Sequence, residues 1–188
     1  MIVELPTPFN WLRTNRLAIG AFPREWEPLE RAGIQQVFSC CDTTEGEWYP
    51  PSHWRFHRVS LPDHRQQKAL MPENLLSALD HLEAMMLPAG KTPPLYLHCW
   101  GGIERSPLLA IGLLCRLEKL TLLDALAQVR CLHPEARPIT SQLVILEEVI
   151  LNGKRANLPG DNLTSQPETS VSGCEAALHR QRDGLQSP

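Results

Sequence analysis

Hydrophobic positions along the chain follow two periods, one typical of strands and one typical of helices. Short apolar runs predict strands at 34–41, 54–61 and 94–98, and a further short apolar segment lies at 17–20. Apolar residues that recur every three or four positions predict helices at 24–32, 72–87, 107–117, 121–132 and from 140 or 141 to 152. The clearest helical stripe consists of Leu75, Leu79, Leu82 and Met86.

Strands that alternate with helices pair in parallel, so this order predicts an α/β fold with a single layered domain. In such sheets the active groups lie beyond the carboxyl ends of the strands. The residues at or just after those ends are Cys40, Cys41, Asp63 and Cys99. We therefore expect an active site where these strand ends meet.

The pattern fails after Asn152. Residues 153–188 are rich in Gly, Pro, Ser, Thr, Asn and Gln, and they show no sustained period. We predict a folded domain over 1–152 and a mostly disordered tail over 153–188.

Composition and charge narrow the class of protein. The chain has 188 residues, 43% of them hydrophobic and 21% charged, which is typical of a globular domain. A formal net charge of −3 gives no general attraction for nucleic acid or an anionic membrane, so we predict neither as a partner. No apolar run is long enough to span a bilayer, and the start does not resemble a signal segment. Six cysteines are too few for a disulfide scaffold in a chain of this length, so we expect a cytoplasmic location.

One segment carries a recognisable chemistry, with the form H-C-x-x-G-x-x-R-S between a predicted strand and a predicted apolar helix. Successive backbone N–H groups in such a loop form an anion-binding concavity, and glycines allow the tight curl. We expect phosphate to be bound by Trp100, Gly101, Gly102, Ile103, Glu104 and Arg105.

The side chains of this segment suggest a two-step hydrolysis. A Cys99 thiolate, favoured by the field of the loop, would attack phosphorus to form a phosphocysteine, which water then hydrolyses. Arg105 can hold two phosphate oxygens with its planar fork. Ser106 can hydrogen-bond the sulfur, and His98 can order the loop from behind.

The leaving group needs a proton in the first step, and the second step needs a base. One carboxyl group can do both. Asp63 follows a predicted strand in Leu61-Pro62-Asp63, at the same edge of the sheet as Cys99. We predict Asp63 to be this acid; the alternative is that it only forms a turn after Pro62.

Over residues 14–152 the chain resembles the dual-specificity branch of the protein tyrosine phosphatase superfamily. The resemblance rests on the loop at 98–106, the acid segment at 61–63, and Gly33-Ile34 with Val37. Within that branch, Cys99-Trp100-Gly101-Gly102 and Gly33-Ile34-Gln35 are most similar to the cyclin-dependent-kinase-associated phosphatases. The resemblance implies a mostly parallel sheet of four or five strands flanked by helices, a phosphoprotein substrate, no metal and no organic cofactor.

Two other functions stay open. A phosphatase for lipid, inositol or RNA phosphates would be expected to carry basic residues inside the loop, where this chain has Trp100, Ile103 and Glu104. We place Glu104 on the rim of the loop, where it should repel clustered negative charge. A phospho-binding scaffold without turnover is disfavoured, because the nucleophile, the arginine and the acid are all present.

Cysteines and histidines outside the loop allow two further hypotheses. A second thiol near Cys99 could trap the oxidised form of Cys99 as a disulfide. Adjacent strand residues face opposite sides of the sheet, so at most one of Cys40 and Cys41 can form this disulfide. We favour Cys41, because it lies nearer the strand end and matches a cysteine of the kinase-associated relatives. The alternative is that both are buried thiols. No metal site is predicted from the histidines, which have neither a cysteine cluster nor a helical frame: His53, His57 and His64.

Overall fold

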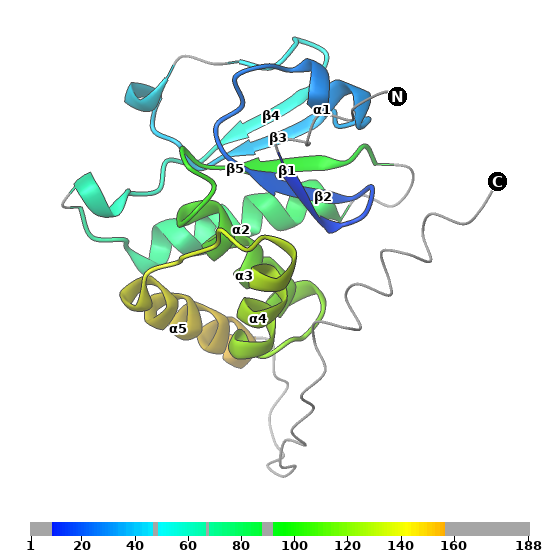
Figure 1. Cartoon of the computed structure of the whole chain (residues 1–188). Helices are drawn as coiled ribbons and strands as arrows, with labels where there is room; N and C mark the ends of the chain where they lie inside the picture. Colours follow the sequence, from blue (N-terminus) through cyan, green and yellow to red (C-terminus); the bar gives the residue numbers. More distant parts are fainter. Residues whose placement is uncertain (1–8, 47–48, 67, 88–91, 157–188) are drawn as a thin grey trace.

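The computed structural model describes residues 9–156, apart from 47–48, 67 and 88–91. At its centre is a five-stranded sheet in the order β1-β2-β5-β3-β4 (Figure 1). The strands are β1 (Phe9–Arg13), β2 (Leu17–Gly20), β3 (Gln36–Ser39), β4 (Arg55–Arg58) and β5 (Leu95–His98). Only β1 is antiparallel to its neighbour. The predicted α/β domain with a mostly parallel sheet is confirmed, and β1 is an edge strand that we did not predict.

Helices cover both faces of this sheet (Figure 1). On one face lies α1 (Glu27–Arg31). The other face is covered by α2 (Pro72–Met86), α3 (Arg105–Leu117), α4 (Leu122–Leu132) and α5 (Thr140–Ala156). The larger hydrophobic core lies on this second side and includes Leu79, Leu97, Leu109 and Leu146. Helix α3 is buried from Arg105 to Cys115, as its continuous apolar sequence predicts.

The parallel strands bring three loops to one edge of the sheet. Ser39 in β3 is in register with His98 in β5, and the Cys40 N–H continues the ladder with a hydrogen bond to the His98 carbonyl (2.8 Å). The loop after β4 joins them, because the Leu61 N–H donates to the Cys40 carbonyl (3.2 Å). Short 3-10 turns then follow β3 and β4, at η1 (Thr43–Glu45) and η2 (His64–Gln66). This edge carries the candidate site.

The end of the folded region differs slightly from the expected one. Helix α5 runs to Ala156, beyond the predicted boundary at 152. Most of the predicted tail, 157–188, lies outside the described residues, so the division into domain and tail stays a prediction. Among the helices that the structure describes, none has the length and apolar character needed to cross a membrane.

Candidate active site

The loop after β5 is held by carbonyl groups that bond to the protein around it. Trp100 O accepts a hydrogen bond from the Phe22 N–H (3.0 Å). Gly102 O accepts one from His133 Nε2 (2.7 Å), and Ile103 O accepts one from the Arg137 N–H (2.6 Å). These three peptide carbonyls therefore point away from the centre of the loop.

The same geometry turns N–H groups inward. None of the described peptide bonds is cis, and across a trans peptide the N–H points opposite to the carbonyl that precedes it. The N–H groups of Gly101, Ile103 and Glu104 therefore converge on the inside of the loop. Such a ring of donors, next to the N-terminus of α3, is suited to an anion with several oxygens.

Gly102 is required where the loop packs on the end of β2. Its φ of +69° lies in the region that favours glycine. A Cβ atom there would lie 2.6 Å from the carbonyl carbon of Gly20 and 2.8 Å from the nitrogen of Ala21. Both neighbours are backbone atoms, so a side chain would displace the loop or the strand end.

Cys99 lies at the base of this concavity and is 2% exposed. The Ser106 hydroxyl donates to its Sγ (3.3 Å), as the sequence predicts. His98 lies behind it, stacked on Tyr96 with ring centroids 5.6 Å apart, and its Nδ1 is 3.4 Å from the Cys99 carbonyl oxygen. Burial lowers the pKa of His98 to about 3, so the ring is neutral and supports the loop without adding charge.

Arg105, the first residue of α3, is almost completely buried and held by several partners. Its two Nη atoms donate to the two carboxylate oxygens of Glu45, each at 2.7 Å. Nη2 also donates to Asp63 Oδ2 (3.2 Å). Burial opposes the charge of Arg105, but the hydrogen bonds to Glu45 outweigh it and raise the pKa. The guanidinium fork is thus fixed beside the loop by a bidentate ion pair.

Glu45 is a functional candidate that the sequence analysis missed. It ends the turn η1, whose capping box joins the Asp42 N–H to Glu45 Oε2 (2.8 Å) and the Thr44 N–H to Asp42 Oδ1 (2.9 Å). Burial alone would raise the pKa of Glu45, but the hydrogen bonds from Arg105 and Asp42 lower it. The D-x-x-E pattern at 42–45 could have signalled the turn, but nothing local signals its partner in α3.

Asp63 lies at the same edge, between the loop and η2. Its Oδ1 accepts the Arg65 N–H (2.9 Å), and its side chain is 11% exposed. Burial raises the pKa of Asp63, but the Arg65 hydrogen bond and the charge of Arg105 outweigh it and lower the value. The lowered pKa favours the carboxylate form of Asp63, and its side chain lines the pocket, where the predicted general acid has to lie.

Glu104 differs from the prediction. We expected it on the rim, but its side chain is only 9% exposed. Gln142 Nε2 from α5 donates to its Oε1 (2.6 Å), and its Oε2 is in contact with His64 Nδ1. The reason is its position at the start of a buried helix, where α5 and η2 close over it. Its negative charge remains in the pocket wall.

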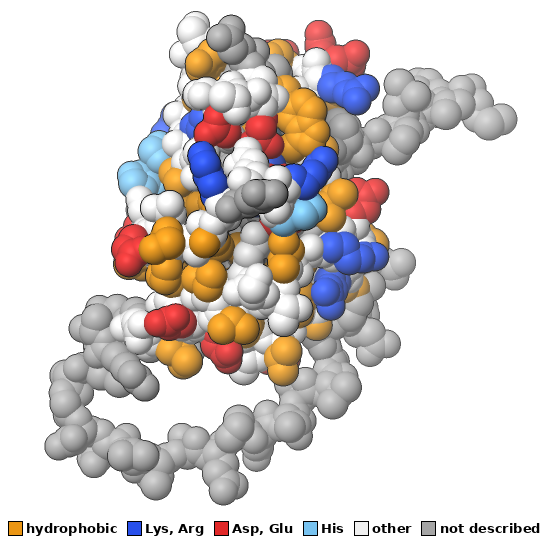
Figure 2. Space-filling view, turned by 90° about the vertical axis from the view of Figure 1, so that its left-hand side faces the viewer, with side chains coloured by type: hydrophobic (Ala, Val, Ile, Leu, Met, Phe, Trp, Pro, Cys, Tyr) orange, Lys and Arg blue, Asp and Glu red, His pale blue; other side chains and the backbone are white. Residues whose placement is uncertain are grey.

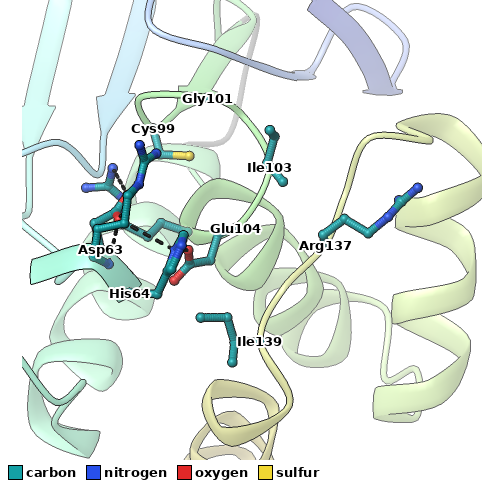
Figure 3. Close-up of a pocket in the computed structure, with 10 residues that line it drawn as sticks. Asp63, His64, Cys99, Gly101, Ile103, Glu104, Arg137 and Ile139 are labelled. Atoms are coloured by element: carbon teal, nitrogen blue, oxygen red, sulfur yellow. Dashed lines mark hydrogen bonds and ion pairs between the residues drawn. The ribbon is translucent and has the colours of Figure 1, made fainter. Parts of the chain in front are cut away.

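These groups surround a pocket of about 240 Å³ (Figure 3). Asp63, His64 and Glu104 lie on one side of it and Arg137 on the opposite side. Figure 2 looks at this edge of the sheet and shows acidic and basic side chains interspersed around it. The pocket is lined by Asp63, His64, Arg65, Cys99, Gly101, Ile103, Glu104, Arg105, Arg137 and Ile139. Trp100 lies beside it, 47% exposed and packed against Phe22.

The structure favours Cys40 over Cys41 as a neighbour of Cys99. Cys40 and Cys99 share the larger core and follow the last paired residues of β3 and β5. Cys41 is absent from that cluster, and burial followed by the charge of Glu45 raises its pKa to about 12. The ladder of β3 stops at Ser39, two residues before Cys41, whereas our choice of Cys41 assumed a strand that runs as far as this residue.

The comparisons with known proteins bear on the fold. No family model and no curated protein matches the chain. Human DUSP28 has 22% identity and a TM-score of 0.64, over 80% of this chain and 97% of that one. Tk-PTP in its active form has 23% identity and a TM-score of 0.65, over 78% of this chain and 99% of that one. PTPMT1 in complex with PI(5)P has 16% identity and a TM-score of 0.62, over 79% of this chain and 99% of that one. The chain therefore has the fold of dual-specificity and tyrosine phosphatases, and the closer resemblance to kinase-associated phosphatases stays a prediction.

Proposed function

We propose that the chain hydrolyses phosphomonoesters of phosphoproteins through a phosphocysteine on Cys99. The observation that carries this proposal is the convergence of a buried thiol, inward N–H groups and a fixed arginine fork on one small pocket. The shared fold supports the same chemistry. The finer assignment, a dual-specificity enzyme for phosphotyrosine and phosphoserine or phosphothreonine, comes from the sequence motif.

In the first step the phosphate dianion occupies the loop, and its oxygens accept hydrogen bonds from the N–H groups of Gly101, Ile103 and Glu104. Arg105 holds two of these oxygens as charge moves onto them. The Cys99 thiolate attacks phosphorus while the bond to the leaving oxygen breaks. Protonated Asp63 gives its proton to that oxygen, so an alcohol or phenol leaves.

In the second step water attacks the phosphorus of the phosphocysteine. Asp63, now a carboxylate, takes a proton from the water, and the P–S bond breaks. The sulfur leaves as a thiolate, which the Ser106 hydroxyl stabilises by the hydrogen bond already present at 3.3 Å. Inorganic phosphate is released, and the proton taken from the water is left on Asp63.

Two variants test the mechanism. Cys99→Ser should abolish turnover and keep phosphate binding, because a serine hydroxyl stays protonated where a thiol ionises. Asp63→Asn should lower turnover about 10²–10⁴-fold for substrates with poor leaving groups, and less for an activated aryl phosphate. Turnover by Cys99→Ser, measured with phosphate release, would refute the proposal.

The substrate class needs its own experiment. The side chains of Asp63 and Glu104 place two acidic groups on one wall, which favours a single phosphate over a cluster of phosphates. Arg65 and Arg137 also line the pocket, and the fold is shared with PTPMT1, whose structure contains PI(5)P. A panel of phosphopeptides, inositol phosphates and a phosphoinositide lipid should therefore rank phosphopeptides first. Preference for the lipid would transfer the proposal to that class.

A further inference from the structure

One wall of the pocket gathers three metal-ligating side chains. Ligand atoms of Asp63, His64 and Glu104 all lie within 4.8 Å of one another. His64 Nδ1 is 3.5 Å from Asp63 Oδ1 and in hydrogen-bond contact with Glu104 Oε2. Figure 3 shows the three side chains directed toward one point beside the nucleophile.

These donors are held in place by the surrounding structure. Gln142 donates to Glu104 Oε1 (2.6 Å), and both residues are buried, so the remaining oxygen Oε2 is directed at His64. Asp63 is fixed by the Arg65 N–H and by Arg105. Outer partners of this kind orient ligands and raise metal affinity. The His64 side chain is 53% exposed, which leaves a path from solvent.

The donor set selects the kind of ion. Zinc ligands lie about 2.0–2.2 Å from the metal, which places ligand atoms of a tetrahedron roughly 3.3–3.6 Å apart. The separation of 3.5 Å between Asp63 and His64 already fits. His64 Nδ1 and Glu104 Oε2 are in direct contact, so an ion bound between them would move them apart. An imidazole with two carboxylates suits Zn²⁺ better than Mg²⁺ or Ca²⁺, which prefer oxygen alone.

We propose that Asp63, His64 and Glu104 form an inhibitory Zn²⁺ site, with a fourth position open to the pocket. Binding itself needs only these three ligands. The inhibition rests on the proposed function: a coordinated Asp63 carboxylate cannot carry the proton that the leaving group requires. Zinc then switches off the acid and leaves the loop and Arg105 in place.

The first test measures binding without turnover. Cys99→Ser removes the thiol as a competing ligand, and Zn²⁺ is titrated into this protein against a chromophoric chelator. We expect one equivalent of Zn²⁺ to bind. When His64→Asn or Glu104→Gln is introduced into the Cys99→Ser protein, the affinity for Zn²⁺ should fall at least about tenfold. The matched control is His53→Asn, an exposed histidine that precedes β4 at the opposite edge of the sheet and should have no effect. Mg²⁺ should not compete.

A second measurement joins binding to turnover. In the enzyme with Cys99 intact, Zn²⁺ should inhibit hydrolysis of a phosphopeptide, and His64→Asn should raise the inhibitory concentration at least about tenfold. Absence of binding to the Cys99→Ser protein, or binding that neither His64→Asn nor Glu104→Gln weakens, overturns the site. If no substrate is turned over, the proposed function fails while the titration still decides the metal site.

Discussion

The bidentate contact between Glu45 and Arg105 should be worth a measurable part of catalysis. Glu45→Gln keeps the shape of the side chain, but it removes the charge and turns one of two acceptors into a donor that faces the guanidinium. A hydrogen bond to a charged group contributes about 1.5–3 kcal/mol. Both side chains are mostly buried, at 2% and 16% exposed, so solvent screens this contact little.

The loss should appear where Arg105 matters most, in the transition state. Each ~1.4 kcal/mol is a factor of ten in rate, so about 1.5–3 kcal/mol predicts a fall in kcat/KM of roughly 10–150-fold. The assay is steady-state hydrolysis of an activated aryl phosphate, whose rate hardly depends on Asp63. Glu118→Gln is the matched control, because Glu118 makes a bidentate pair with Arg13 outside the pocket. A folded Glu45→Gln protein with kcat/KM within about twofold of the parent would show that Arg105 needs no such support.

Three further outcomes follow from the structure. Gly102→Ala should remove phosphate binding and turnover, whereas Gly101→Ala should reduce them less, because only a Cβ at Gly102 would meet backbone atoms, at 2.6 Å. Equal losses of phosphate affinity in the two variants, measured by phosphate titration, would contradict this. Mild peroxide should form a Cys40–Cys99 disulfide, since adjacent parallel strands lie about 4.8 Å apart; peptide mapping should find the link in Cys41→Ser and not in Cys40→Ser. The pKa values of Glu45 and Asp63 are lowered in the folded state, so their stabilisation is complete above pH 4.5 and is lost as the pH falls through the folded values. Urea unfolding of Glu45→Gln should therefore depend less on acid pH than unfolding of the parent.

The sequence was sufficient for the parts of the fold that repeat a local pattern. Helix α2 begins at Pro72, as predicted, because its apolar stripe and its proline act within a few turns. The edge strand β1 was not predicted, because Phe9–Arg13 carries no clear alternation and is stabilised by pairing with β2. Strand ends were also set too long, since the ladder of β3 stops at Ser39.

The candidate site likewise contains residues that the sequence predicts and residues that it does not. Cys99, Arg105 and Ser106 follow from a contiguous motif whose spacing is itself the signal. Glu45 and His133 do not, because each acts on the loop from a distant part of the chain. His133 is buried and joins Asn10 Oδ1 (2.6 Å) to the Gly102 carbonyl (2.7 Å), a contact that no local pattern records. Supporting residues of this kind depend on tertiary structure, and one sequence does not contain that signal.

In the proposed mechanism, the contact between Arg105 and Asp63 connects substrate binding to acid catalysis. Burial raises the pKa of Asp63, but the hydrogen bond from the Arg65 N–H and the charge of Arg105 outweigh it, so the carboxylate form is favoured. A bound phosphate dianion would take over hydrogen bonds of Arg105 and add negative charge beside Asp63. Both changes raise the pKa of Asp63, because a like charge disfavours its ionised form. The proposed mechanism therefore expects Asp63 to gain its proton as a phosphate enters the loop, and to act as the base once that proton has left with the alcohol.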